Sequence, residues 1–449
     1  MFLRSRFVCV LLLALAASGA SAQPFESSDL PLVIVDVGRE IPNEPKVEGR
    51  MRIVDNGPGE RNRPDDAATG YDGPIGIELR GATSRTKYAK KQYAVETRDE
   101  AGANLNVPLL GFPEENDWIL HAPYSDKTLM RNVLAYRLAR EMGQYASRTR
   151  YVELILDGEY QGVYVLMEKI KRDDGRVDIA TLNPDETSGD DLTGGYIVKI
   201  DKRSGGERGG WLSPVRAPGW GGSGRPLYQF HDPKPSEIAP EQAAYIENWI
   251  SDFERALMAE TIEDPARGYP AFIDLASFVD YFLLVELSKN VDGYRLSAYF
   301  HKDKDSNGGL LRAGPVWDVN IGFGNADYYS GADPEGWQVL MTQAEDPFQI
   351  PAWWPRLVQT ESFQSAARAR WAELRAGPLA TDSLVARVDG IADQLDEAQA
   401  RNFQRWPVLG RRIWPNEFVG ETYAEEVDFL RSWLRQRLAW MDGELLAEP

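Results

Sequence analysis

An α+β fold is expected for this chain, with a smaller β-rich part followed by a larger, mainly helical part. Up to about residue 170, short runs of alternating apolar and polar residues predict strands around one main helix. Beyond that point, most regular segments carry apolar residues at helical spacing. The 449 residues, 43% hydrophobic and 27% charged, suffice for one large two-part domain or two ordinary ones.

Residues 1–22 form a separate segment. Arg4 and Arg6 precede a nearly unbroken apolar stretch at 7–17, and the small residues of Ala20-Ser21-Ala22 follow. This order predicts a secretory signal peptide that is cleaved after Ala22. The apolar stretch is too short to span a bilayer comfortably. We therefore expect a secreted or periplasmic protein without an integral membrane segment after cleavage.

Cysteine content and net charge restrict the possible chemistry and binding partners of the protein. The single cysteine, Cys9, lies in the predicted signal, so the mature protein would have no disulfide and no thiol ligand. The net charge is −19, and it becomes −21 once the two signal arginines are removed. Such a surface repels nucleic acid and anionic lipid. It is compatible with a basic protein partner, or with solubility alone.

Strand signals dominate residues 23–170. Ser125 or Asp126 can cap one main helix that ends near Met142. A hairpin is expected around the Asp157-Gly158 turn, because this dipeptide separates two alternating runs. Further strands are expected at 33–37, 51–54, 75–80 and 92–97.

Helical patterns dominate residues 171–449. A segment rich in Gly and Pro covers 181–235 and reads as an insertion with a short strand at 195–202. A second hairpin is expected between 297 and 312. Helices are expected at 240–260, 273–289, 363–376, 381–400 and 423–446.

Two aspartates stand out by context. Asp292 lies where an apolar helix breaks into a loop, and Asp318 lies between an apolar strand and a Gly-rich turn. A carboxylate in such surroundings is costly unless it is paired or bound to a metal. The expected hairpin between them would bring both acids to one edge of the same part of the molecule.

This arrangement suits phosphoryl transfer, in which one carboxylate orients the attacking hydroxyl and another holds Mg²⁺. Lys90 or Lys91 could neutralise phosphate charge, since they open a strand after a Gly-containing turn. The spacing alone fits a general acidic pair, a loop cap or a structural ion pair equally well. The three histidines lack metal-ligand spacing and no Gly-x-Ser-x-Gly motif occurs, so neither a zinc site nor a serine triad is expected.

Several ordered segments resemble the spore-coat protein H (CotH) kinase family. Arg80-Gly81-Ala82-Thr83-Ser84, followed by Lys90-Lys91-Gln92-Tyr93, is similar to its Arg-Gly-x-Ser/Thr turn and Lys-Lys-x-aromatic strand. The stretch from Asp157 to Glu168 is similar to its hairpin. Asn290-Val291-Asp292 and Gly314-Pro315-Val316-Trp317-Asp318 are similar to its second half. The resemblance spans roughly residues 70–445.

The resemblance implies a divergent, two-lobed protein-kinase-like fold, with an N-terminal lobe at 23–170 and a C-terminal lobe at 171–449. It also implies an ATP-dependent kinase that uses Mg²⁺ or Mn²⁺ and phosphorylates Ser or Thr of a protein. By position, Asp292 would be the catalytic acid and Asp318 a metal ligand. The nucleotide would be bound by Arg80, Gly81, Thr83, Ser84, Lys90 or Lys91, Met167 and Glu168.

Two positions depart from this pattern. Ser297 stands where kinase catalytic loops carry a metal-binding Asn, and Asn320 stands where the family often has a second acid. Both changes weaken one metal position, so a nucleotide-binding pseudokinase or a coat or envelope assembly protein is the alternative. Secretion and thirteen tryptophans also allow a carbohydrate-active hydrolase, which would need two opposed acids in an open cleft.

Overall fold

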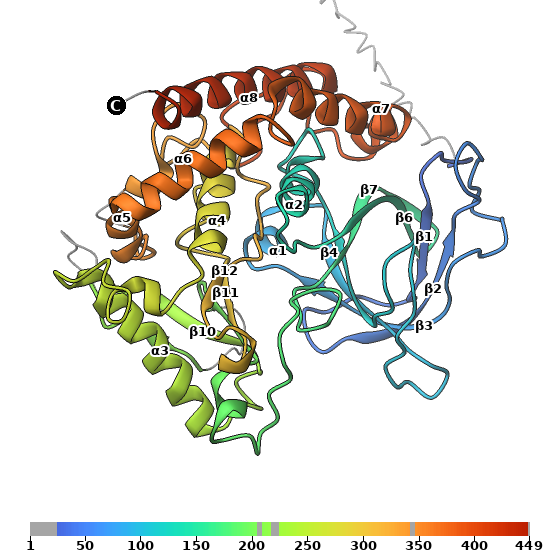
Figure 1. The fold of residues 1–449 in the computed structure, drawn as a ribbon. Coiled ribbons are helices and arrows are strands. Elements are labelled where there is room, and N and C mark those ends of the chain that lie inside the picture. Colours follow the sequence, from blue (N-terminus) through green and yellow to red (C-terminus); the bar gives the residue numbers. More distant parts are fainter. Residues whose placement is uncertain (1–24, 204–208, 217–223, 342–345, 448–449) are drawn as a thin grey trace, which may run out of the picture.

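The computed structural model describes residues 25–203, 209–216, 224–341 and 346–447, so the predicted signal peptide lies outside the described residues. A barrel of strands occupies one side of the molecule, and most helices occupy the other side (Figure 1). The two longest helices, at the C-terminal end of the chain, cross above both parts.

The first part is a closed barrel of seven strands. Its interior is filled by apolar side chains from all sides, including Ile75, Trp118 and Tyr164. The first strand pairs antiparallel with the second and parallel with the sixth, and the latter pairing closes the barrel. Around the barrel the order is β1 (Leu32–Asp36), β2 (Val47–Val54), β3 (Asp72–Arg80), β4 (Gln92–Thr97), β5 (Asp117–His121), β7 (Glu159–Glu168) and β6 (Thr149–Leu156).

A second sheet of five strands lies in the remainder of the chain. Three of its strands come from the segment at 181–235, so the described parts of that segment contribute to the sheet. The other two form the hairpin that was expected between 297 and 312. The order is β12 (Leu311–Ala313), β11 (Ala298–Lys302), β8 (Tyr196–Ile200), β10 (Leu227–Asp232) and β9 (Trp211–Leu212).

The described residues contain eight α-helices. The central helix α4 is buried on nearly every side, which explains its almost continuous apolar sequence. Nowhere in the described part of the chain does a helix have the length and apolar character needed to cross a membrane. The helices are α1 (Thr83–Lys87), α2 (Arg131–Glu141), α3 (Pro240–Met258), α4 (Leu275–Ser288), α5 (Trp353–Leu357), α6 (Glu361–Arg375), α7 (Thr381–Arg405) and α8 (Tyr423–Leu445).

The expected kinase-like two-lobed fold is wrong. The N-terminal strands close into a seven-stranded barrel, and the C-terminal part contains a five-stranded sheet of its own in addition to helices. Closure depends on the pairing of β1 with β6, two strands more than a hundred residues apart. Local alternation of apolar residues reveals that a strand exists, but it does not reveal a partner at that distance.

Helix α7 joins the helical part to the barrel. Its Asn402 Oδ1 accepts hydrogen bonds from the Val163 N–H (3.1 Å) and from Lys90 Nζ (2.8 Å). Gly162 has φ +90°, and a Cβ there would lie 2.5 Å from Asn402 Oδ1, so only glycine allows this close approach. The preceding residue, Arg401, forms a 2.6 Å ion pair with the fully buried Glu153.

Candidate active site

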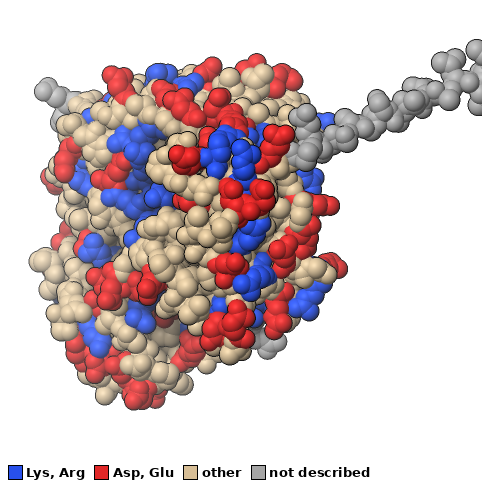
Figure 2. Space-filling view, turned by 90° about the vertical axis from the view of Figure 1, so that its right-hand side faces the viewer, with Lys and Arg blue, Asp and Glu red and all other residues tan. Residues whose placement is uncertain are grey.

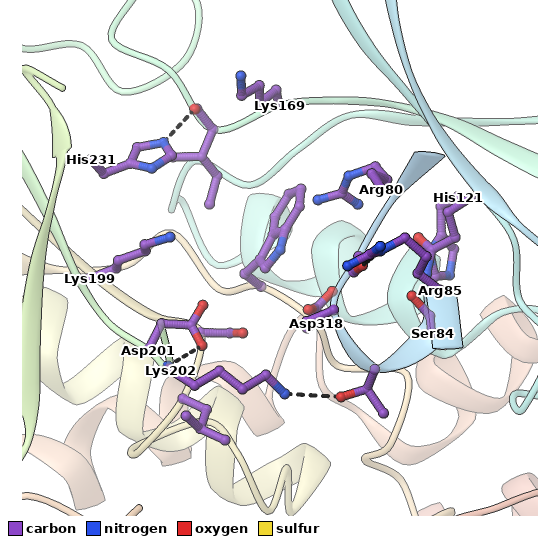
Figure 3. A pocket seen from close by; sticks show the side chains of 18 of the residues that line it. Arg80, Ser84, Arg85, His121, Lys169, Lys199, Asp201, Lys202, His231 and Asp318 are labelled. Atoms are coloured by element: carbon purple, nitrogen blue, oxygen red, sulfur yellow. Dashed lines mark hydrogen bonds between the residues drawn. The ribbon is translucent and has the colours of Figure 1, made fainter. Parts of the chain in front are cut away.

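A pocket of about 1320 Å³ lies between the barrel and the second sheet. The end of β3 and helix α1 form one wall, from Arg80 to Arg85. The residues that end β8 and β10 form the opposite wall, and the loops that carry Asp292 and Asp318 line the space between. Figure 3 shows Arg80 and Arg85 on the barrel side, facing Asp201 and Lys202 across the pocket.

Asp292 follows α4 and is held by one arginine. Its Oδ1 accepts a 2.6 Å hydrogen bond from Arg295 Nη2. The same guanidinium donates to the Asp346 carboxylate and to the backbone oxygens of Val291 and Phe348, so it is fixed on several sides. Burial raises the pKa of Asp292, and the charge of Arg295 opposes this rise. The result is an oriented carboxylate at the edge of the pocket.

Asp318 has the left-handed backbone conformation, with φ +51°. Helix α2 holds this loop, because the Asp318 N–H donates to Tyr136 Oη (3.2 Å) and the Val319 N–H donates to Asn132 Oδ1 (2.8 Å). The two α2 residues are one helical turn apart and therefore lie on the same face. They present the Asp318 side chain to the open pocket, where it is exposed.

The Asp318 carboxylate has neither a hydrogen bond nor an ion pair with any other residue that the structure describes. Desolvation by the surrounding protein raises its pKa, the nearby Arg80 guanidinium lowers it, and the negative charge of Asp292 raises it again. The charge of Asp292 thus acts on Asp318, as expected for carboxylates that line one pocket. Asp318 is free to bind a cation.

A chain of polar contacts connects the Asp318 loop with the barrel. His121 in β5 lies 3.0 Å from Gln92 Oε1 through Nδ1, and 3.3 Å from Asn132 Nδ2 through Nε2. Burial lowers the pKa of His121 to about 3, so the ring is neutral. Nδ1–H therefore donates to Gln92, and Nε2 accepts from Asn132. This arrangement orients the amide that holds the loop.

Cationic side chains reach the pocket from both walls. The Arg80 guanidinium lies 5.8 Å from the centre of the Trp317 ring, beside Asp318. From the other wall, Lys202 Nζ donates a 3.0 Å hydrogen bond to Thr83 Oγ1. The neighbouring Asp201 accepts from the Lys202 N–H, and burial raises the pKa of Asp201 to about 6. The sequence did not single out Asp201 or Lys202, although both lie at the end of the strand expected at 195–202; in the structure they directly follow β8.

A sequence model of the CotH kinase protein family matches residues 77–441. The chain belongs to the CotH kinase family. The match covers most of the chain and confirms the resemblance seen in its motifs. No curated protein sequence matches the chain. Membership of the CotH kinase family indicates a kinase-like function and, in general terms, the use of ATP with a divalent metal.

Eight of the residues that the CotH resemblance implicates lie around this pocket. They come from the end of β3 and helix α1, from the loop after α4 and from the loop after β12, so the fold brings together segments more than 200 residues apart. The eight are Arg80, Gly81, Thr83, Ser84, Asp292, Ser297, Asp318 and Asn320.

The other four implicated residues lie outside the pocket lining. Lys90 is fully buried and donates to the Val163 carbonyl and to Asn402, whereas Lys91 Nζ donates to the carbonyls of Arg85 and Tyr88. Met167 and Glu168 are buried at the end of β7, where Glu168 pairs with Arg148 at 2.7 Å. The chain enters the pocket lining only at the next residues, 169–172.

The donor chemistry of the pocket fits a divalent cation bound together with phosphate. Among the described residues, no group of three or more His, Cys, Asp or Glu side chains could hold a metal ion. Mg²⁺ in phosphoryl-transfer sites is commonly bound by one or two carboxylates, with phosphate and water completing the shell. Asp318 and Asp292 supply such carboxylates, and Asn320 and Ser297 add neutral oxygens in the same lining.

Proposed function

We propose that this CotH family member is an ATP-dependent kinase that transfers the γ-phosphate to Ser or Thr of a protein outside the cytoplasm. The observation that supports this most strongly is the shared pocket of Asp292 and Asp318, which faces the cations Arg80 and Lys202. Phosphoryl transfer depends mainly on positioning and on neutralising charge, and these groups suit both tasks.

In the proposed reaction, the Asp292 carboxylate orients the acceptor hydroxyl and takes its proton. A bond then forms between the hydroxyl oxygen and the γ-phosphorus, the bond to the β-phosphate oxygen breaks, and ADP leaves. Arg295 keeps Asp292 in position through its 2.6 Å hydrogen bond. Asp318 would hold Mg²⁺ or Mn²⁺ with help from Asn320 and Ser297, and the bound ion would supply positive charge at the phosphates.

The remaining lining residues suggest how a nucleotide would lie. Arg80, Arg85 and Ser84 would contact the phosphates from the barrel side, and residues 169–172 would lie toward the base. The pocket exceeds the roughly 300–1,000 Å³ of ordinary small-molecule sites, so it has room for a nucleotide and part of an acceptor.

The proposed acceptor is a basic or Ser/Thr-rich protein rather than a nucleic acid. The chain carries a net charge of −19, and acidic side chains are spread over the barrel face with Lys and Arg between them (Figure 2). A negative surface attracts basic chains and repels phosphate backbones. The predicted signal peptide would bring the kinase and such an acceptor together in the periplasm or outside the cell.

The test uses the mature chain with γ-labelled ATP, Mg²⁺ or Mn²⁺, and a basic Ser-containing protein as acceptor. We expect label on that protein or on the chain itself, and a loss of about 10²–10⁴-fold in Asp292→Asn. Asp318→Asn should lose transfer and lose its response to added metal. Asp428→Asn, an exposed α8 carboxylate, is the matched control and should retain transfer.

Ser297 and Asn320 favour one alternative, in which the chain binds nucleotide without transferring phosphate. In that case ATP with metal would raise the thermal unfolding midpoint, while no acceptor would be labelled with either metal. A chain that neither binds ATP nor labels any acceptor would contradict both forms of the proposal.

A further inference from the structure

Lys202 connects the two walls of the pocket. It follows β8 in the second sheet, yet its Nζ reaches Thr83 Oγ1 in helix α1 at 3.0 Å. In Figure 3 its side chain extends across the pocket beneath Asp318, toward the barrel. Its ammonium is therefore positioned where ligands of either wall would meet it.

The hydrogen-bond acceptor of Lys202 is neutral and therefore binds the ammonium only weakly. No carboxylate of the described residues lies within 4 Å of Nζ, and a neutral hydroxyl is its hydrogen-bond acceptor. Three carboxylates, those of Asp201, Asp292 and Asp318, line the same pocket as this ammonium. An ammonium close to three carboxylates, but paired with none of them, can exchange a hydroxyl for an anionic oxygen, which forms the stronger hydrogen bond.

The two lysines that the sequence motif suggested for phosphate binding already form hydrogen bonds with other groups. Lys90 is buried against α7, and Lys91 is bound to two backbone carbonyls. We propose that Lys202, supplied by the second sheet, contacts the phosphates of the bound nucleotide and leaves Thr83 when it does so. This inference rests on the proposed function, because it assigns a residue to the same nucleotide site.

A purely structural role is the competing explanation, since the bond to Thr83 also ties the barrel to the second sheet. The two roles differ in what they require. A phosphate contact requires the ammonium, whereas a tie requires both partners of the hydrogen bond. Lys202→Met removes the ammonium, and Thr83→Val removes the tie but leaves the ammonium in the pocket.

The experiment measures the dissociation constants of ATP–Mg²⁺ and of adenosine by calorimetry, using the whole mature chain. For Lys202→Met we expect ATP affinity to fall by roughly tenfold or more, with adenosine affinity unchanged. Lys202→Arg should restore most of the loss. Thr83→Val should reduce the preference for ATP over adenosine much less. Lys304→Met, whose cation pairs with Asp191 outside the pocket, should bind both ligands as the unaltered chain does.

Two outcomes would overturn the inference while leaving the proposed function standing. One is an ATP affinity that is unchanged in Lys202→Met. The other is an equal loss of the ATP preference in Lys202→Met and Thr83→Val, which would make Lys202 a tie between the walls. If the unaltered chain fails to bind ATP, the proposed function itself fails. Thermal unfolding midpoints show whether each variant is folded, and the Arg variant decides the question if the Met variant is not.

Discussion

Glu254 in α3 is a buried carboxyl group that forms no ion pair with any residue the structure describes. Its two oxygens accept hydrogen bonds from Tyr228 Oη (2.8 Å) and Ser213 Oγ (2.7 Å), and burial raises its pKa to about 7. The folded state therefore keeps a proton that the unfolded chain loses near pH 4.5. This contribution to stability is complete below pH 4.5 and disappears as the pH rises through 7.

Glu254→Gln removes this dependence, because the amide is neutral at every pH. We expect the variant to exceed the unaltered chain in free energy of unfolding by on the order of 3 kcal/mol at pH 8, with the difference shrinking toward pH 4. Urea denaturation at several pH values measures it. A difference that stays constant with pH would show that Glu254 does not carry the proton in the folded state.

A substitution at Lys90 should affect stability but not nucleotide binding. Complete burial holds the pKa of its amine well below the usual lysine value, and its hydrogen bonds go to Val163 and Asn402 rather than to the pocket. We expect Lys90→Met to lower the free energy of unfolding by about 1–3 kcal/mol, the cost of leaving these buried acceptors unpaired. Its ATP dissociation constant should not change. A selective loss of ATP binding would return Lys90 to the phosphate-binding role that its motif suggests.

Helix α2 acts on the site through the backbone of the Asp318 loop. Tyr136→Phe leaves the Asp318 N–H without its acceptor, at a cost of about 1–3 kcal/mol. Because the loop carries the proposed metal ligand, we expect lower phosphate transfer and a higher metal requirement, with little change in adenosine binding. Tyr151→Phe is the control. It also removes a buried tyrosine hydroxyl, but that hydroxyl donates to the Leu129 carbonyl, outside the pocket lining. Equal transfer by both variants would contradict a positioning role for α2.

Individual elements follow closely from local sequence patterns. The strand expected at 92–97 is β4, the turn at Asp157-Gly158 joins β6 to β7, and the helix expected at 240–260 is α3. These succeed because periodicity and turn residues act over a few positions. The helix expected from 126 begins only at Arg131, because Asp126 instead accepts hydrogen bonds from Thr128 and from the Arg131 N–H and guanidinium in a buried turn.

The arrangement of those elements depends on contacts between residues far apart in the chain, and the sequence predicted only part of it. Asp292 and Asp318 share a pocket because the β11–β12 hairpin between them returns the chain to the same edge, and that much could be inferred from their spacing. The pairing of β1 with β6 and the contribution of β8 to the opposite wall could not. Asp201 and Lys202 enter the site only through this second sheet, so no local motif identified them.

The ion pair between Arg401 and Glu153 tests whether barrel and helices fold as one unit. Glu153 is completely buried in β6, and Arg401 in α7 reaches it from the helical part. Arg401→Met leaves the carboxylate with the Tyr160 hydroxyl as a neutral partner, and we expect a loss of about 3 kcal/mol in the free energy of unfolding. Arg255→Met in α3 is the control. It removes a guanidinium whose 2.6 Å ion pair with Asp252 is exposed on both sides, and it should cost less than about 0.5 kcal/mol.

The course of unfolding distinguishes one cooperative unit from two. Trp118 reports on the barrel interior and Trp371 on the helical core. Variants in which one of these two is the main remaining tryptophan therefore follow the unfolding of each part separately. Because α7 is bonded to β7 through Asn402 as well as to β6 through Arg401, losing one contact should shift both signals together along urea concentration. If the barrel signal moved to lower urea while the helical signal stayed in place, the barrel would be an independent domain held to the rest mainly by this ion pair.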